Sequence, residues 1–426
     1  MKPTYNHRLT GLLLALFAAC FSMGQAFAQQ ELQIHHINVN NGDATMIGIY
    51  DHSTQKYTAK ILIDGGLSTA GASLLPYIQK IAADTHFKYI ILTHYHNDHY
   101  TGLNALGSGQ LTADSLVDPG GYDFKTYFPA QPRLKLLAEP KPASMTVASQ
   151  WLSMVSKATS HHFLNGRSEV FISYGTGNSS GLGRKLLIGQ LGGLPVTLEC
   201  VAGWGNTLNN GPTVADPLPD KNNANNFSLA FVLRCGEFRY FIGGDLGGSS
   251  QDVYINQEDP LIRYLAIDLP AVHTLNGQLH GGGHICGFKA DHHGSSYANS
   301  AAFMGAMSPT VTVTSAGDKS GWHLPREKYL GLLSALQPLS GQKGVYFTNL
   351  HDWGTGKNSL TTAQSLFKNK PGISFDYGNP QGHAYSYMIR VKPEHLDTES
   401  DFEVARVDIT QADPYTSLSV FQCHKK

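Results

Sequence analysis

The sequence is poor in charge, in cysteine and in long apolar runs. Only 15% of its 426 residues are charged, and 31 Lys and Arg nearly balance 32 Asp and Glu. Such a balance does not favour a protein that coats nucleic acid or anionic lipid. None of the five cysteines forms a C-x-x-C pair, which argues against a cysteine-based zinc site. Beyond residue 28, no apolar stretch is long enough to cross a bilayer.

The first 28 residues differ from the rest. A basic start, "MKPTYNHR", precedes the apolar "LTGLLLALFAACFSMG" and the small residues of "AFA" before Gln29. This order predicts a secretory signal peptide, residues 1–28, cleaved after Ala28, and therefore a periplasmic or secreted protein. The alternative is a lipoprotein with Cys20 lipidated, although Phe17 suits such a cleavage site poorly.

The mature chain is expected to form one domain over residues 29–426. It contains no Pro/Ser linker, charge block or repeat that would divide it. Losing Lys2 and Arg8 leaves 29 basic against 32 acidic side chains, a net charge of −3. This charge does not favour a dedicated nuclease, which normally needs clustered Lys and Arg, although a local basic groove stays possible. The sequence does not determine the oligomeric state.

Four cysteines stay in the mature chain: Cys200, Cys235, Cys286 and Cys423. In an oxidising compartment they are able to pair. Cys200 ends the strand-like "PVTLEC" and Cys235 ends "SLAFVLRC", so these two could bridge neighbouring strands. Four buried free thiols are the alternative.

Strand-like and helical patterns predict an α/β protein. Strand-like runs include "LQIHHINV", "ATMIGIY", "YTAKILI" and "YIIL", with a helical pattern at residues 69–84. A second β-rich series comprises "VFISY", "KLLIG", "PVTLEC", "FSLAFVL" and "FRYFIGG". Strands "VTVTS", "GVYFT" and "AYSYMIRV" then alternate with helices at 325–336 and 361–367. Two such series predict two packed sheets with helices outside.

The strongest chemical signal is "ILTHYHNDHYTG", residues 91–102. His94 and His96 alternate, so on an extended segment both point to one side and can reach one ion. Asp98 and His99 follow where the strand ends, and can reach a second ion nearby. Imidazole and carboxylate groups are typical ligands of zinc and similar ions. Four such side chains in six positions are difficult to explain by packing or solubility.

Partners for this cluster stand at the ends of other strand-like segments. Asp64 ends "ILID", Asp245 follows "YFIGG", and His292 and His293 follow "GFKAD". Each of these positions alone has an ordinary explanation as a turn or polar residue. Together with the cluster they indicate a site that forms only when the chain folds.

"THYHNDH" resembles the HxHxDH signature of the metallo-β-lactamase fold superfamily. "ILIDGG", "IGGD" and "DHHGS" resemble its other motifs, in family order. Four segments are similar to the branch that holds the hydrolase-like domain of the bacterial competence (DNA-uptake) channel protein and phosphorylcholine esterase: "INVNNGDATMI", "NNFSLAFVL", "KADHHGSSYANS" and "SAGDKSGWHLP". The resemblance implies a four-layer αββα sandwich and a metal-dependent hydrolase.

The resemblance also implies a role for each matching residue. His94 and His96 would hold one divalent ion; Asp98, His99 and a histidine of "DHHGS" would hold a second. Asp245 would bridge the two ions. We expect His292 to be the ligand and His293 to contact the substrate, with the reverse assignment left open.

Three further expectations complete the implied site. Asp64 would orient the ligand histidines without touching metal. His323, together with Asp98 and His293, is a candidate catalytic or substrate-contacting residue. Zinc is the expected metal, with manganese as the alternative.

The chain departs from the pattern in one place. No histidine stands between His162 and Asp245, where the superfamily supplies a third ligand for the first ion. Asn225 and Asn226 occur there and either border the site or form a turn.

Three functions follow from this sequence. The first is a secreted phosphodiesterase that uses metal-bound hydroxide on a nucleic acid or on a small or polymer-linked phosphodiester. The second is a β-lactamase or lactonase, and the third is a non-catalytic metal-containing binding protein.

Overall fold

The computed structural model describes the chain in a series of segments. They are residues 30–67, 74–106, 108–119, 182–203, 206–208, 223–251, 254–268, 272–275, 278–281, 285–317, 323–340, 344–351, 359–378, 385–396 and 400–423. The predicted signal peptide and the strand expected at "VFISY" lie outside these segments.

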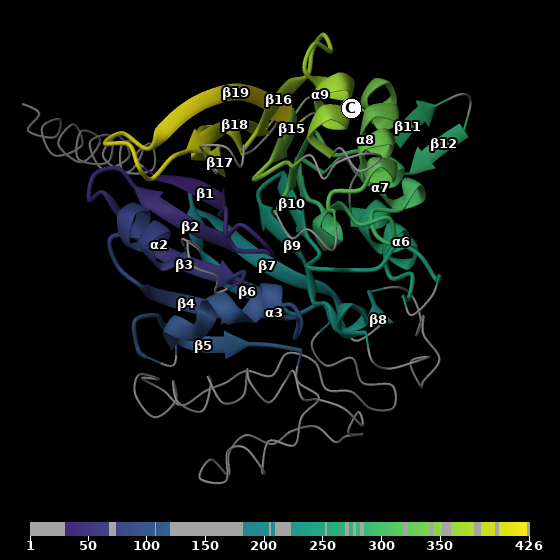
Figure 1. The fold of residues 1–426 in the computed structure, drawn as a ribbon. Helices are drawn as coiled ribbons and strands as arrows, with labels where there is room; N and C mark the ends of the chain where they lie inside the picture. Colours follow the sequence, from purple (N-terminus) through teal and green to yellow (C-terminus); the bar gives the residue numbers. More distant parts are fainter. Residues whose placement is uncertain are drawn as a thin grey trace, which may run out of the picture.

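Two large sheets face each other (Figure 1). The first has the order β19-β18-β17-β1-β2-β3-β4-β5. Its strands are β1 (Gln30–His36), β2 (Thr45–Asp51), β3 (Lys56–Ile63), β4 (His86–Ile91), β5 (Thr112–Val117), β17 (Ser386–Val391), β18 (Ser400–Val407) and β19 (Tyr415–Cys423).

The second sheet has the order β16-β15-β14-β13-β10-β9-β7-β6, with β8 paired to β7. Its strands are β6 (Lys185–Leu191), β7 (Leu194–Gly203), β8 (Asn206–Thr207), β9 (Ala230–Cys235), β10 (Phe238–Ile242), β13 (Gly287–Lys289), β14 (Val311–Thr314), β15 (Gly344–Phe347) and β16 (Ser374–Tyr377). A separate hairpin pairs β11 (Val272–Leu275) with β12 (Gln278–Gly281).

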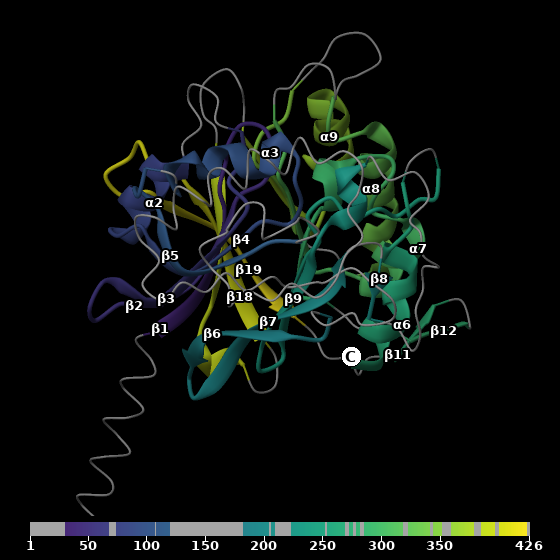
Figure 2. The same ribbon diagram turned by 90° about the horizontal axis from the view of Figure 1, so that it is seen from below.

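Helices cover the outer faces of both sheets (Figure 2). The first sheet carries α2 (Leu74–Ala82), α3 (Asn97–Tyr100) and the 3₁₀ turn η1 (Thr101–Leu106). The second carries α6 (Glu258–Asp268), α7 (Ala301–Met307), α8 (Glu327–Ser340) and α9 (Ser359–Phe367). Further 3₁₀ turns are η2 (Ala224–Phe227), η3 (Asp291–Gly294) and η4 (Pro393–His395). The predicted αββα sandwich is confirmed.

Strand alternation produces the layers. On β3, Ile61 and Ile63 belong to the core between the sheets, while Leu62 packs in the core under α2. Successive side chains of a strand point to opposite faces, so a sheet covered on both sides needs apolar residues at nearly every position. A third core lies under α6 to α9, built around side chains such as Phe288 and Phe303. No helix in the described segments is long and apolar enough to cross a membrane.

Of the possible arrangements, a bridge between Cys200 and Cys235 does not form. Cys200 pairs in register with Phe231, four residues before Cys235. That offset is about 13 Å along a strand, beyond the reach of a disulfide. The disulfide instead joins Cys286 to Cys423 across 137 residues, and Cys200 and Cys235 are buried free thiols.

The C-terminal strands β18 and β19 were not predicted. They extend the first sheet beyond β17 in an antiparallel ladder, with a register shift between Val404 and Ala405. Many side chains of β19 are partly or fully exposed, Val420 among them at 69%. The edge strand therefore lacks the continuous apolar pattern by which the inner strands were found.

Candidate metal centre

The histidine cluster lies where β4 gives way to a short helix. His96 keeps extended backbone angles (φ −79°, ψ 149°), and α3 begins at the next residue, Asn97. His94 and His96 are therefore two positions apart on extended chain, while Asp98 and His99 lie on the first helical turn. This change of backbone lets four neighbouring side chains point in two directions.

Three other strand ends supply the remaining residues. Asp64 follows β3, Asp245 follows β10, and His292 and His293 follow β13. Strands β3 and β4 pair in parallel, as do β10 and β13. Because parallel strands end at the same edge of a sheet, these residues meet between the two sheets.

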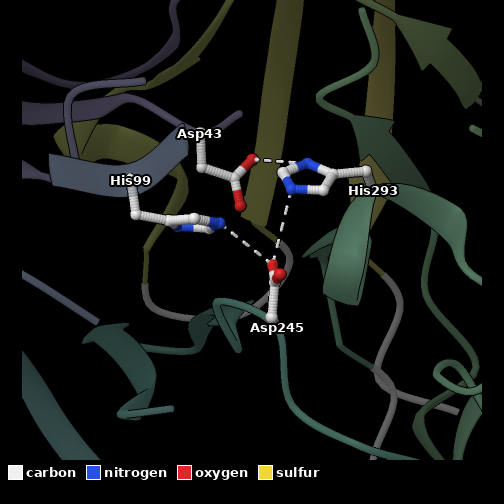
Figure 3. A group of neighbouring side chains, drawn as sticks. All are labelled: Asp43, His99, Asp245 and His293. Atoms are coloured by element: carbon white, nitrogen blue, oxygen red, sulfur yellow. Dashed lines mark ion pairs between the residues drawn. The ribbon is translucent and has the colours of Figure 1, made fainter. Parts of the chain in front are cut away.

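One cluster, which we call the His99 group, comprises Asp43, His99, Asp245 and His293 (Figure 3). His99 Nε2 lies 3.2 Å from Asp245 Oδ1, and His293 Nε2 lies 3.6 Å from the same oxygen. His293 Nε2 is also 3.5 Å from Asp98 Oδ2. Figure 3 shows the four side chains of the group pointing toward a common centre.

A second cluster, the His94 group, comprises His94, His96 and Asp245. His94 Nε2 lies 3.0 Å from His96 Nδ1 and 3.6 Å from Asp245 Oδ2. His94 is fully buried, whereas His96 is partly exposed. Asp245 is common to both groups, which is the position expected of a bridging carboxylate.

Several buried atoms at the centre make no hydrogen bond: both carboxylate oxygens of Asp245, His99 Nε2 and His293 Nε2. Buried polar atoms are normally paired, so an unpaired set that converges on one point calls for a partner. The atoms are imidazole nitrogens and carboxylate oxygens, which suit a divalent cation. The residues present therefore fit the metals that the sequence resemblance implies.

The electrostatics of the centre also favour a cation. Burial opposes charge on His99, yet the carboxylates of Asp245 and Asp64 hold its pKa well above the ordinary value. Burial likewise opposes ionisation of Asp245, but the charges of His99 and His293 hold its pKa well below the usual range. Positive charge is thus stabilised beside Asp245, as a metal ion would be.

The histidines of the His94 group are neutral. Burial and the nearby charge of His99 hold the pKa of His94 well below its ordinary value, and burial also lowers that of His96. A neutral imidazole has a free lone pair, as a metal ligand requires.

Asp64 holds His99 and Thr93 in place. Its Oδ2 accepts hydrogen bonds from His99 Nδ1 at 2.8 Å and from Thr93 Oγ1 at 2.7 Å, and its Oδ1 accepts one from the Thr93 amide at 2.8 Å. Because Nδ1 of His99 donates to Asp64, Nε2 is the ring nitrogen that faces Asp245. Asp64 thus has the geometry of the orienting carboxylate that the sequence predicts.

Sequence reasoning did not find the buried pair of Asp43 and Lys289. The Lys289 ammonium forms an ion pair with Asp43 and donates to the carbonyls of Gly244 at 3.2 Å and Ala290 at 3.1 Å. Asp43 Oδ1 lies 3.6 Å from His293 Nδ1. The only sequence signal for Asp43 was its segment, "INVNNGD", and Lys289 had none beyond its place before "DHHGS".

The two histidines of "DHHGS" take different places. His293 belongs to the His99 group, and its Nδ1 donates to the carbonyl of Ser315 at 3.2 Å. His292 belongs to neither group, although its Nε2 lies 3.7 Å from Asp245 Oδ2. Burial lowers the pKa of His292 to about 4.

His323 belongs to neither group and lies in the loop before α8, partly exposed, with φ 51°. Three residues later, the amide of Arg326 donates to the carbonyl of Gly294, directly after the histidine pair. The loop is therefore fixed to the edge of the centre, while a role for His323 in substrate contact stays a prediction.

Comparisons with known proteins give a partial family match and a structural match. Residues 55–109 match the family described as the metallo-beta-lactamase superfamily, over a segment that holds Asp64 and the HxHxDH cluster. No curated protein matches the chain. Among solved structures, one described as a new diphosphatase from the PhnP family aligns with 85% of this chain and 97% of its own, with 9% identity and a TM-score of 0.36.

Proposed function

We propose that this protein is a secreted hydrolase of phosphodiesters that uses two divalent metal ions. The proposal starts from the metallo-β-lactamase fold and from Asp245, which belongs to both ligand groups. The observation that carries the proposal is the arrangement of two ligand groups around one carboxylate. His94, His96 and Asp245 would hold one ion; Asp98, His99, His293 and Asp245 would hold the other. Zinc fits these donors, and manganese is the alternative.

Bound there, two such ions would polarise a phosphoryl group and lower the pKa of a water molecule. The chain itself orients the ligands. Asp64 keeps the proton of His99 on Nδ1, and the carbonyl of Ser315 does the same for His293. Both histidines therefore present Nε2 to the centre, in a setting with little exposure to water.

The open side of the centre lies at His96. His94, His99 and Asp245 are at most 1% exposed, whereas His96 is partly exposed. Substrate is therefore expected to approach past His96, and His323 is the proposed contact at the neighbouring edge. The choice of a phosphodiester rests on the similarity of four segments to the competence-protein and phosphorylcholine esterase branch.

Secretion is part of the same proposal. Its basis is the leader sequence of residues 1–28, and the disulfide between Cys286 and Cys423 supports an oxidising compartment. Intact-mass measurement of protein recovered from the periplasm should give a chain that begins at Gln29. A full-length chain retained in the cytoplasm would contradict this part.

A substrate panel tests the activity. Zinc- and manganese-loaded protein is given bis-p-nitrophenyl phosphate, p-nitrophenyl phosphorylcholine, DNA, nitrocefin and a lactone, each with and without chelator. Chelator-sensitive turnover of a phosphodiester is expected. Turnover of nitrocefin or the lactone alone would show a lactamase or lactonase in place of the proposed phosphodiesterase. No turnover of any substrate would show that the protein is not an enzyme of these classes.

A matched pair of variants links activity to the centre. His96→Ala should abolish turnover while the protein stays folded, because His96 is partly exposed and contributes little to the core. His86→Ala, at a surface histidine 45% exposed on β4, should retain full activity. Equal activity in both variants would show that turnover arises elsewhere.

A further inference from the structure

The His94 group is one imidazole short. His94 and His96 are its two histidines, and the sequence between His162 and Asp245 contains no other. With Asp245 the group supplies three ligands, one of them shared with the second ion, whereas a closed tetrahedral zinc site has four. The structure therefore raises the question of which side chain completes this group.

The two oxygens of Asp245 face different histidines. Oδ1 lies 3.2 Å from His99 Nε2 and 3.6 Å from His293 Nε2. Oδ2 lies 3.6 Å from His94 Nε2 and 3.7 Å from His292 Nε2. The carboxylate thus divides four histidines into two pairs, and its Oδ2 joins His292 to His94.

The backbone of η3 separates the two neighbouring rings. His292 and His293 both adopt left-handed angles (φ 48° and 53°), which non-glycine residues rarely do. Their ring centroids lie 6.1 Å apart at an interplanar angle of 70°. The amide of His292 donates to the carbonyl of Gly244 at 3.0 Å, which fixes this turn against the residue before Asp245.

The neighbours of the two rings agree with this division between the oxygens of Asp245. His293 Nδ1 lies beside Ser315 and Asp43, on the side of the His99 group (Figure 3). His292 Nε2 lies 3.4 Å from Asn225 Nδ2. The same Nε2 atom lies 3.7 Å from Asp245 Oδ2, the oxygen that His94 Nε2 also faces, so His292 lies on the side of the His94 group.

We propose that His292 and His293 serve different ions, with His292 as the third imidazole ligand of the His94 group. His292 takes the place of the histidine that is missing before Asp245, while His293 completes the His99 group. The first ion then has three imidazoles and one carboxylate oxygen, a common zinc environment. This inference rests on the proposed function, because it assumes that two ions bind.

Metal stoichiometry of double variants tests the pairing. Asn is used at positions 292 and 293 because it tolerates left-handed backbone and lacks the Nε2 atom. After zinc loading and dialysis, elemental analysis should give about two ions per chain for the wild type and for the surface control His86→Ala. Each of His292→Asn and His293→Asn should keep about one tightly bound ion, with the affinity for the other at least ~10-fold weaker.

The double variants discriminate between assignments. His94→Asn with His292→Asn removes two ligands of one ion, so about one ion should stay bound. His292→Asn with His293→Asn removes one ligand from each ion, so neither should stay tightly bound. The opposite pattern would place His292 with His99 and overturn the inference. Circular dichroism of the metal-free variants checks that each is folded.

A second measurement leaves His292 and His293 unmutated, so it still applies if their variants do not fold. In protein labelled with ¹⁵N-histidine and loaded with ¹¹³Cd²⁺, each cadmium signal splits according to the imidazoles bound to it. The ion that loses a coupling in His94→Asn should be the one coupled to three imidazoles, and a count of two would overturn the inference. Wild-type protein that binds fewer than two ions would instead reject the proposed binuclear centre itself.

Discussion

Asp64→Asn is the sharpest single test of how the centre is organised. The substitution preserves size, and Asn accepts the left-handed backbone at this position (φ 57°). In the native protein Asp64 Oδ2 accepts two hydrogen bonds, from Thr93 Oγ1 and from His99 Nδ1. If the oxygen of the new amide keeps the hydrogen bond from the Thr93 main-chain NH, its NH₂ group faces Thr93 Oγ1 and His99 Nδ1. Two donors then face each other, because His99 Nδ1 also carries a proton.

The conflict between two donors is relieved if the proton of His99 moves to Nε2. That atom lies 3.2 Å from Asp245 Oδ1 and is the one available to a metal. Loss of an orienting carboxylate typically weakens metal binding about 10- to 100-fold, or roughly 1.4 to 2.8 kcal/mol. We expect a loss in this range for the ion held by His99 and a smaller effect on the ion held by His94.

Two measurements check this expectation. Zinc affinity is obtained by competition with a chromophoric chelator, and the presence of a proton on His99 Nδ1 is read from ¹⁵N chemical shifts of labelled metal-free protein. Asp114→Asn is the matched control, because Asp114 accepts from His86 in a pair that is about half exposed. Zinc affinity within about threefold of the wild type, with the His99 proton still on Nδ1, would refute the reasoning.

Four further predictions concern stability, each measured by urea unfolding. Gly42→Ala should cost more than about 2 kcal/mol, since its Cβ would lie 1.7 Å from the Asp98 carbonyl oxygen at φ +92°. Gly193→Ala should cost only about 1 kcal/mol, because at φ +81° its Cβ meets nothing within 4 Å. Reduction of the Cys286–Cys423 disulfide should cost about 2 to 5 kcal/mol, and insensitivity to reductant would show that it does not form. Burial lowers the pKa of His35 from 6.5 to about 3. Between pH 6.5 and 5, His35 therefore binds a proton in the unfolded chain but not in the folded protein, and the free energy of unfolding falls by about 2 kcal/mol. His35→Gln should remove that share of the pH dependence, and an unchanged slope would contradict the assignment.

Local patterns in the sequence predicted much of the architecture. Inner strands such as β9 and β10 are buried at all but one position, so they appear as nearly continuous apolar runs that are easily recognised. The edge strand β19 is half exposed and mixed in composition, and it was missed. The sequence also left the cysteine pairing open, because strand register decides which cysteines can meet, and register is a property of the paired strands.

The residues of the centre likewise include some that the sequence predicts and some that it does not. Spacing alone predicted His94 and His96 as a pair, because residues two apart on extended chain share a face wherever that chain lies, and Asp98 and His99 follow directly. The buried pair of Asp43 and Lys289 gave no such local signal. These residues are 246 positions apart in the sequence, and only the packing of the first sheet on the second brings them together.

The sequence by itself determined the fold class, the residue types of the candidate metal centre and the strand ends that carry them. Those features depend on residue type and on short-range periodicity, which each segment contains within itself. The tertiary structure alone decided how Asp245 divides its two oxygens among four histidines, and on which side each ring of the His292–His293 pair lies. Both depend on left-handed backbone at two successive residues and on contacts between separate sheets, which exist only once the chain has folded.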